Sequence, residues 1–173
     1  KDAAIAEKLD AKLMKDDNIY DLIEAEEQAE RDILAEREDA LARELAEMRR
    51  RKRKLVDPLQ YAMSIAAEDL VGYVPTFAWE MAPASAKQPE FLEKRGIFSE
   101  SVQNMGQASM IIDRLKRRQD EGLSTPKQIR CLEKYGFRQV GTWQFDAANN
   151  MISRIQSNSW RLPYGFNAAD YRP

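Results

Sequence analysis

Two stretches of equal length decide the fold: SAKQPEFLEKRGIFSESVQNMGQASMIIDRL at residues 85–115 and TPKQIRCLEKYGFRQVGTWQFDAANNMISRI at residues 125–155. At a fixed offset of 40 they align without a gap and share nine of 31 positions. An internal repeat governs the prediction of a fold, because each copy forms the same local structure. The C-terminal half is therefore predicted to consist of two copies of one module.

Each copy is predicted to be a helix, an extended loop and a second helix. Thr125 has the character of an N-cap, Pro126 of a first helical residue and Gln128 of the return arm of a capping box. Gly136 ends the first helix, because glycine enters the left-handed conformation at little cost. The corresponding residues of the first copy are Ser85, Gln88 and Gly96.

Apolar residues at helical spacing predict the buried face of each second helix. They are Met105, Ala108, Ile111, Ile112 and Leu115 in the first copy, and Phe145, Ala148, Met151, Ile152 and Ile155 in the second. Cys131 falls where the first copy has Phe91, so we interpret it as a buried small hydrophobic residue. Trp143 replaces Gln103 and is either a core anchor of the second copy, which we favour, or an exposed stacking residue.

Composition narrows the function. The chain has 173 residues, 43% of them hydrophobic, with no histidine and one cysteine. Zinc sites, catalytic triads and disulfide frameworks are therefore almost excluded, and no cofactor is expected. No apolar run approaches the roughly 20 residues of a membrane span, and no signal peptide is recognisable. We expect no membrane contact, and the single cysteine fits a reducing cytoplasm.

Charge is segregated along the chain. Residues 1–48 carry −9, residues 49–54 carry +6, residues 55–84 carry −4 and residues 85–173 carry +5. Such asymmetry is a sign of nucleic-acid contact, although charge runs are more often solvated faces.

The acidic N-terminal segment, residues 1–56, is predicted to be helical. A short amphipathic helix over residues 1–16 precedes a long helix from about Ile19 to Leu55 that no glycine or proline interrupts. Its leucines and methionines recur at spacing seven, but Glu38 and Lys52 break the companion seam of a coiled coil. We favour a solvated strut that packs one face on a neighbour, with self-association as a dimeric coiled coil as the alternative.

The long helix ends in six consecutive cations. Cations near a helix C-terminus complement the macrodipole, but six exceed that need. Because they surround the helix, they suit a nucleic-acid backbone contacted with little reading of sequence. The alternative is a solvated or acid-paired run. The residues are Arg49, Arg50, Arg51, Lys52, Arg53 and Lys54.

Residues 57–84 are predicted to form a helical and aromatic connector. Asp57 and Pro58 have the pattern of an N-cap and a first helical residue, opening a helix through about Ala67. For the aromatic stretch that follows, which includes Phe77 and Trp79, core packing is favoured over a stacking platform for bases. The two repeat modules then occupy residues 85–122 and 123–173, and the aromatic tail is predicted to fold back on the second module.

The repeats supply further candidate phosphate contacts. Lys87 and Lys127 fall in the first turn of their helices, where unsatisfied backbone N–H groups favour anions. Equally, their recurrence can record the duplication alone. The remaining candidates are Lys94, Arg114, Lys116, Arg117, Arg118, Lys134 and Arg154.

Three phrases carry a resemblance to a known family: DPLQYAMSI at residues 57–65, YVPTFAWEM at residues 73–81 and TPKQIRCLEKYGF at residues 125–137. They resemble the C-terminal region of large superfamily 2 DEAD/DEAH-box helicases found in phages and mobile elements of gut bacteria. The resemblance implies an accessory region that follows two RecA-like motor domains. In shape alone, the predicted repeats also resemble SAP- or LEM-like modules, of which the SAP type binds duplex DNA.

The sequence contains neither a G-x-x-x-x-G-K-[ST] loop to hold a triphosphate nor a DEAD-type acidic box. We therefore expect no enzyme activity from this chain by itself, and the resemblance implies helicase motor domains as a partner. The predicted function is an accessory region that binds nucleic acid, DNA rather than RNA. The alternative is a protein-interaction or oligomerisation module built on the charged helix and the repeats.

Overall fold

The computed structural model describes the backbone of residues 19–173 and the side chains of residues 26–173. This part of the chain is all-α, as predicted, and its only β-type pairings are two isolated bridges, Val56 with Ile97 and Leu123 with Gln144. The helix predicted over residues 1–16 lies outside the described residues.

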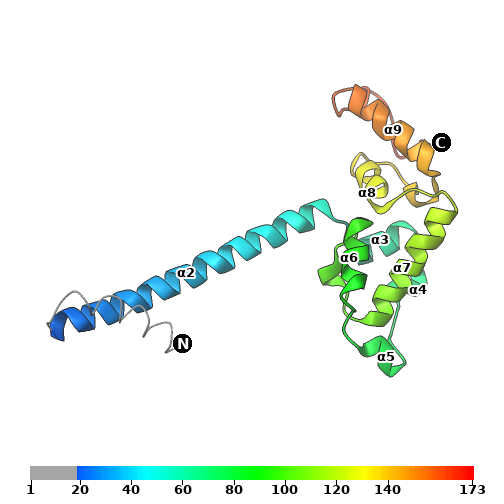
Figure 1. Cartoon of the computed structure of the whole chain (residues 1–173). Coiled ribbons are helices and arrows are strands. Elements are labelled where there is room, and N and C mark those ends of the chain that lie inside the picture. Colours follow the sequence, from blue (N-terminus) through cyan, green and yellow to red (C-terminus); the bar gives the residue numbers. More distant parts are fainter. Residues whose placement is uncertain (1–18) are drawn as a thin grey trace. The chain divides into compact units, whose positions relative to one another are not determined.

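The chain divides into two compact units, Lys1–Arg50 and Arg51–Pro173. The long helix α2 spans Ile19–Lys54 without a break, which confirms its prediction (Figure 1). Alanine, glutamate, arginine and leucine dominate it, and these residues have high helix propensity. Leu34, Leu41 and Met48 are exposed along it. Pairing of this helix with a second copy stays a prediction.

The second unit opens with three short helices, α3 (Pro58–Ser64), α4 (Glu68–Val71) and α5 (Ala78–Met81). The Asp57 carboxylate accepts the N–H groups of Leu59 and Gln60 at 3.0 and 3.3 Å, so the predicted cap is confirmed. Helix α3 ends three residues earlier than expected, because Ala66 turns into the left-handed region at φ 52°.

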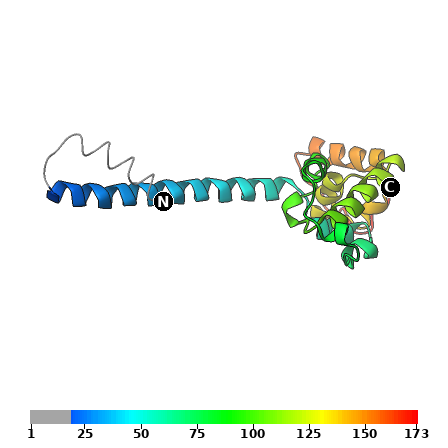
Figure 2. The same cartoon turned by 60° about the horizontal axis from the view of Figure 1, so that its bottom comes forward.

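The two repeats follow. The first consists of α6 (Lys87–Lys94), the 3₁₀ turn η1 (Ser99–Ser101) and α7 (Met105–Asp120). The second consists of α8 (Pro126–Lys134), η2 (Val140–Thr142) and α9 (Phe145–Ser157). The prediction of an extended loop is therefore wrong in part, because each loop contains a 3₁₀ turn. Figures 1 and 2 show α6 packed along α7 and α8 along α9.

Equivalent hydrogen bonds hold the two repeats together internally. The side-chain amide of Gln88 donates to the carbonyl of Met105 at 3.3 Å, and that of Gln128 donates to the carbonyl of Phe145 at the same distance. Each glutamine thus ties the first helix of its repeat to the start of the second. Gly96 and Gly136 end the first helices at φ 93° and 90°.

The caps of the first helices differ between the copies. In the second, the Thr125 hydroxyl accepts the N–H of Gln128, and the side-chain amide oxygen of Gln128 accepts the N–H of Thr125 at 2.9 Å. In the first, the Gln88 oxygen accepts the N–H of Ser85 at 2.9 Å, but no side chain caps the start of α6. The predicted capping box is therefore complete in the second copy only.

One hydrophobic core runs through both repeats and includes Tyr61 of α3. Leu92 and Leu132, equivalent residues of the two copies, are fully buried. Trp143 is buried and lies 5.5 Å, between ring centroids, from Phe137 and from Tyr171. The predictions that Trp143 anchors the core and that the tail folds back on the second module are confirmed.

The expectation of core packing is wrong for Phe77 and Trp79, whose exposed fractions are 63% and 53%. Helix α5 instead contacts α7 through Glu80, and Tyr73, which precedes α5 in the chain, contacts α7 beside it. Both lie over Gly106, where a Cβ atom would come within 1.9 Å of the Tyr73 hydroxyl oxygen. Gly106 makes room for these two polar residues, and the Phe77 and Trp79 rings lie outside the core.

Candidate nucleic-acid interface

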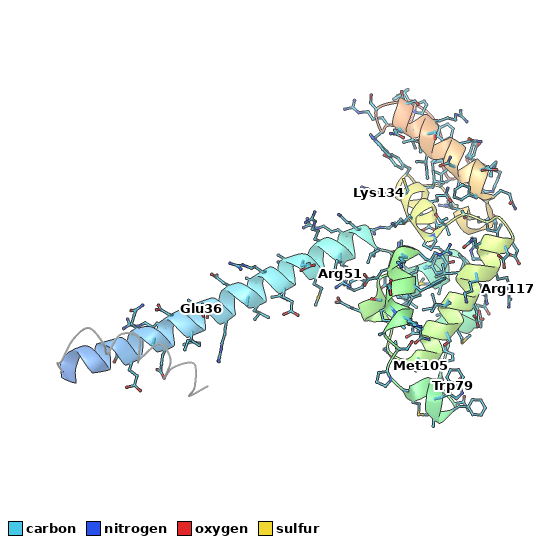
Figure 3. All side chains as sticks on the ribbon, viewed as in Figure 1. Glu36, Arg51, Trp79, Met105, Arg117 and Lys134 are labelled. Carbon is cyan, nitrogen blue, oxygen red and sulfur yellow. The ribbon has the colours of Figure 1, made fainter. Side chains whose placement is uncertain are left out.

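Not all of the fifteen cations predicted to contact nucleic acid are available for such a contact. In the basic run, Arg49 and Arg50 are exposed in the first unit, and Lys52, Arg53 and Lys54 are exposed in the second. Arg51, which is labelled in Figure 3, is different, because its guanidinium pairs with Glu93 and, at 2.6 Å, with Glu100. Arg51 therefore fastens the end of α2 to the first repeat.

Two further candidates pair with carboxylates. Arg114 on α7 lies 2.6 Å from the Asp69 carboxylate of α4, and Lys94 lies 2.7 Å from Glu90 one turn earlier on α6. The Lys94 amine holds the pKa of the Glu90 carboxyl below its usual range. Arg114 joins two elements of the fold, whereas the Lys94 pair is exposed and contributes little to stability.

Arg118 is buried, with an exposed fraction of 9%. One of its terminal nitrogens donates to the carbonyls of Ser124 and Gly141 at 3.2 and 2.7 Å, which links the end of α7 to the second repeat. Sequence patterns did not separate it from its exposed neighbours Lys116 and Arg117. Its position in the core makes it unavailable for an open surface contact.

Outside the basic run, six candidates remain exposed and make no ion pair among the described residues: Lys87, Lys116, Arg117, Lys127, Lys134 and Arg154. Arg117 on α7 and Lys134 at the end of α8 are labelled in Figure 3. The repeat equivalence of Lys87 with Lys127 does not give the two lysines equivalent surroundings. Lys127 alone lies over a glycine of the other repeat, where its aliphatic stem fills the space that a Cβ of Gly96 would take.

Sequence analysis missed Arg95, which the structure places beside two of these lysines. The Arg95 guanidinium carbon lies 5.2 Å from the centre of the Phe91 ring, and the Lys116 amine lies 5.7 Å from it. Both cations interact with the face of an aromatic ring, a contact that holds long side chains in place. Little in the sequence indicates a binding role for Arg95, because its one distinguishing feature is that it precedes the glycine that ends α6.

Arg95, Lys116 and Lys127, which we name the junction cations, come from α6, α7 and α8. All three are exposed. Lys127 contacts Gly96, the neighbour of Arg95, and Arg95 also donates to the side chain of Gln119 on α7. The fold thus brings together cations that lie up to 32 positions apart in the sequence.

A pocket of about 550 Å³ adjoins the junction cations, and we name it the junction pocket. Arg95, Arg118 and Gln119 line its polar side, and Leu115, Leu123 and Phe145 supply apolar wall. The N-termini of α8 and α9 also border it. They meet there because the N–H of Ser124 donates to the Trp143 carbonyl at 2.9 Å, and that of Phe145 to the Gly122 carbonyl at 2.8 Å.

Within the described residues, no three side chains from His, Cys, Asp and Glu gather closely enough to hold a metal ion. None of the helices in that part of the chain is both long and apolar enough to cross a membrane. Comparisons with models of known protein families, with curated proteins and with solved structures find no match. The resemblance to helicase accessory regions stays a prediction.

Proposed function

We propose that this chain is a nucleic-acid-binding accessory region of an ATP-dependent DEAD/DEAH-box helicase of the cytoplasm. It grips the DNA backbone and does not hydrolyse ATP itself. The observation that carries the proposal is the convergence of three exposed cations, Arg95, Lys116 and Lys127, from three helices. Clustered lysine and arginine side chains are the residues that neutralise phosphates and release their counterions.

The pairing of other cations supports this choice of surface. Arg51 and Arg114 are occupied by carboxylates of the fold, so stability explains them. The junction cations have no carboxylate partner among the described residues. Phosphate contacts of this kind position a protein without reading bases, which suits an accessory region that moves along DNA with its motor.

The test is anisotropy binding to labelled duplex and single-stranded DNA, with RNA in parallel, over a series of salt concentrations. The variant Lys116→Glu/Lys127→Glu reverses two junction cations. Its matched control, Arg138→Glu/Arg161→Glu, reverses two exposed arginines outside the cluster. We expect the junction variant to lose at least about tenfold in affinity and to lower the steepness of the logarithmic salt dependence by about 1.8 on duplex.

Binding that does not change with salt would contradict the proposal. So would equal losses in the two variants, because a general loss of positive charge would then explain the result. Circular dichroism of both variants checks that the helical fold is kept.

A second candidate function, protein interaction, is favoured by the exposed apolar residues around α5. Val74, Phe77, Trp79 and Met81 are all exposed, and Trp79 lies on the outer side of the helix (Figure 3). Residues 68–84 contain no cation, so a nucleic-acid backbone does not suit this part of the surface. Groups of exposed apolar side chains mark sites of protein contact. The helicase motor domains are the partner to test.

Light scattering separates self-association from binding to a motor. A monomer at high concentration would exclude a dimer built on α2 or on α5. Pull-down by the helicase motor that Trp79→Ser weakens, with Met63→Ser as an exposed apolar control on α3, would support docking through α5.

A further inference from the structure

Arg118 is a buried cation without a counter-ion. A guanidinium carries five N–H donors, and buried charges in proteins are normally paired. Arg118 forms no ion pair among the described residues, and its Nε–H has no hydrogen-bond partner there. Tyr61 lies beside it, but burial raises the pKa of this phenol, so Tyr61 stays neutral and does not balance the charge.

The unpaired guanidinium lies on the wall of the junction pocket. Arg95 lines the same pocket, and α8 and α9, helices of nine and thirteen residues, begin at it. The dipole of a helix attracts anions to its N-terminus. Asp146 is the one carboxylate on the described wall, so the two arginines outweigh it.

The rest of the wall is apolar. Leu115 and Leu123 line it. The prediction that Phe145 is buried is wrong, because its side chain is 43% exposed, and its ring offers an aromatic face to the pocket. Pockets that hold small ligands combine such an apolar lining with a few polar groups and occupy about 300–1,000 Å³. An aromatic ring beside cations is also the arrangement that binds single nucleotides of a strand by stacking.

We propose that the junction pocket binds one nucleotide of a nucleic-acid strand, with its phosphate at Arg95 and Arg118 and its base against Phe145. The inference rests on the proposed function and assigns it a single-nucleotide subsite. Backbone contacts at Lys116 and Lys127 then hold the neighbouring phosphates. The chemistry recognised is a nucleoside phosphate, which a strand or a free mononucleotide can supply.

The experiment follows the Arg118 Nε–H resonance in a proton–nitrogen correlation spectrum of the full chain. The probes are a short oligothymidylate, thymidine monophosphate and inorganic phosphate. We expect the Arg118 Nε–H signal to shift with each probe and the amide signals of Phe145 and Asp146 to shift with the two nucleotide probes. Absence of any shift of the Arg118 signal at saturating oligothymidylate overturns the proposal.

Variants at the rim avoid the risk that a change at Arg118 unfolds the chain. Arg95→Gln should weaken binding of all three probes by about tenfold, because it removes one charged hydrogen-bond donor. Phe145→Leu should weaken only the two nucleotide probes. Arg138→Gln, at an exposed arginine outside the pocket, is the matched control and should change nothing.

The two proposals can fail separately. If oligothymidylate binding depends on Lys116 and Lys127 but not on Arg95 or Phe145, the backbone grip stands and the pocket proposal falls. If the mononucleotide shifts Arg118 but no strand binds, the pocket takes a free nucleoside phosphate, and both the strand subsite and the proposed function fall.

Discussion

The two repeats are alike inside and different outside. Leu92 and Leu132 are both fully buried, as are Ala108 and Ala148. At the outer position that Glu90 and Arg130 share, the residues differ in charge and in partner. Glu90 binds Lys94 at 2.7 Å, whereas Arg130 donates to the carbonyls of Leu55 and Arg53 at 2.5 and 2.8 Å.

The difference shows what duplication preserves. A repeat keeps the residues that join its own helices, because each copy needs them to bury its apolar faces. Its outer residues differ in charge and partner, because each copy contacts different neighbouring elements. Arg114 pairs with Asp69 of α4, while its equivalent Arg154 is exposed and unpaired within the described residues. Identity at offset 40 therefore does not by itself indicate a shared binding role.

The largest expected effect tests whether the two copies form one core. Leu92→Ala and Leu132→Ala should each lower the free energy of unfolding by about 2–5 kcal/mol, because each removes a fully buried side chain. Urea unfolding followed by circular dichroism measures it. Leu59→Ala, at an exposed leucine, is the control and should stay within about 0.5 kcal/mol. Two separate transitions in either variant would show that the repeats unfold independently.

A smaller effect separates the two helix-ending glycines. Gly96→Ala and Gly136→Ala should each lose about 1–2 kcal/mol, because both positions have positive φ. Gly96→Ala should lose more, since its new Cβ would come within 2.8 Å of the Lys127 side chain, whereas that of Gly136 meets only Ala168 at 3.8 Å. Adding Lys127→Ala to Gly96→Ala should recover the extra loss of stability, because the new Cβ then no longer meets the Lys127 side chain. If the two glycine variants lose equal stability and Lys127→Ala recovers none of it, the Lys127 side chain does not lie over Gly96 in solution.

The next effect tests the unequal caps. Thr125→Ala should cost about 1 kcal/mol, because its hydroxyl accepts an N–H at the start of α8. Ser85→Ala should change stability by less than about 0.5 kcal/mol, because only the backbone N–H of Ser85 takes part in the first cap. Thermal unfolding of both variants measures the difference. A reversed order would mean that the Ser85 hydroxyl caps α6 in solution.

The smallest effect concerns Cys131, whose counterpart is Phe91. Cys131 is only partly buried, so its interpretation as a buried residue is wrong in part. Partial burial still raises the pKa of its thiol, so the folded chain holds less thiolate than the unfolded chain at mildly alkaline pH. Stability from this thiol is complete below its unfolded pKa and is lost as the pH rises through the folded pKa. A disulfide reagent should react more slowly in buffer than in urea at the same pH. Equal rates would contradict a protected thiol.

Much of the local structure could be predicted from the residues. Asp57, Thr125 and Gln128 fix helix starts through bonds to N–H groups two or three positions away, and Gly136 fixes a helix end through its own φ. Helix α2 follows in the same way from its uninterrupted composition. The burial of Trp143 was also predictable, because the repeat marked its position as a change from Gln103.

The sequence by itself therefore determined the long helix, the four helices of the repeats, the caps at Asp57 and Thr125 and the duplication, since these depend on neighbours within a few residues. Only the tertiary structure decided which cations are available. Arg51 and Arg118 are taken up by Glu93 and Gly141, and Arg95 joins Lys116 and Lys127, through contacts between elements that a linear pattern does not specify. The same applies to Trp79, whose exposure depends on how the segment around α5 packs against α7.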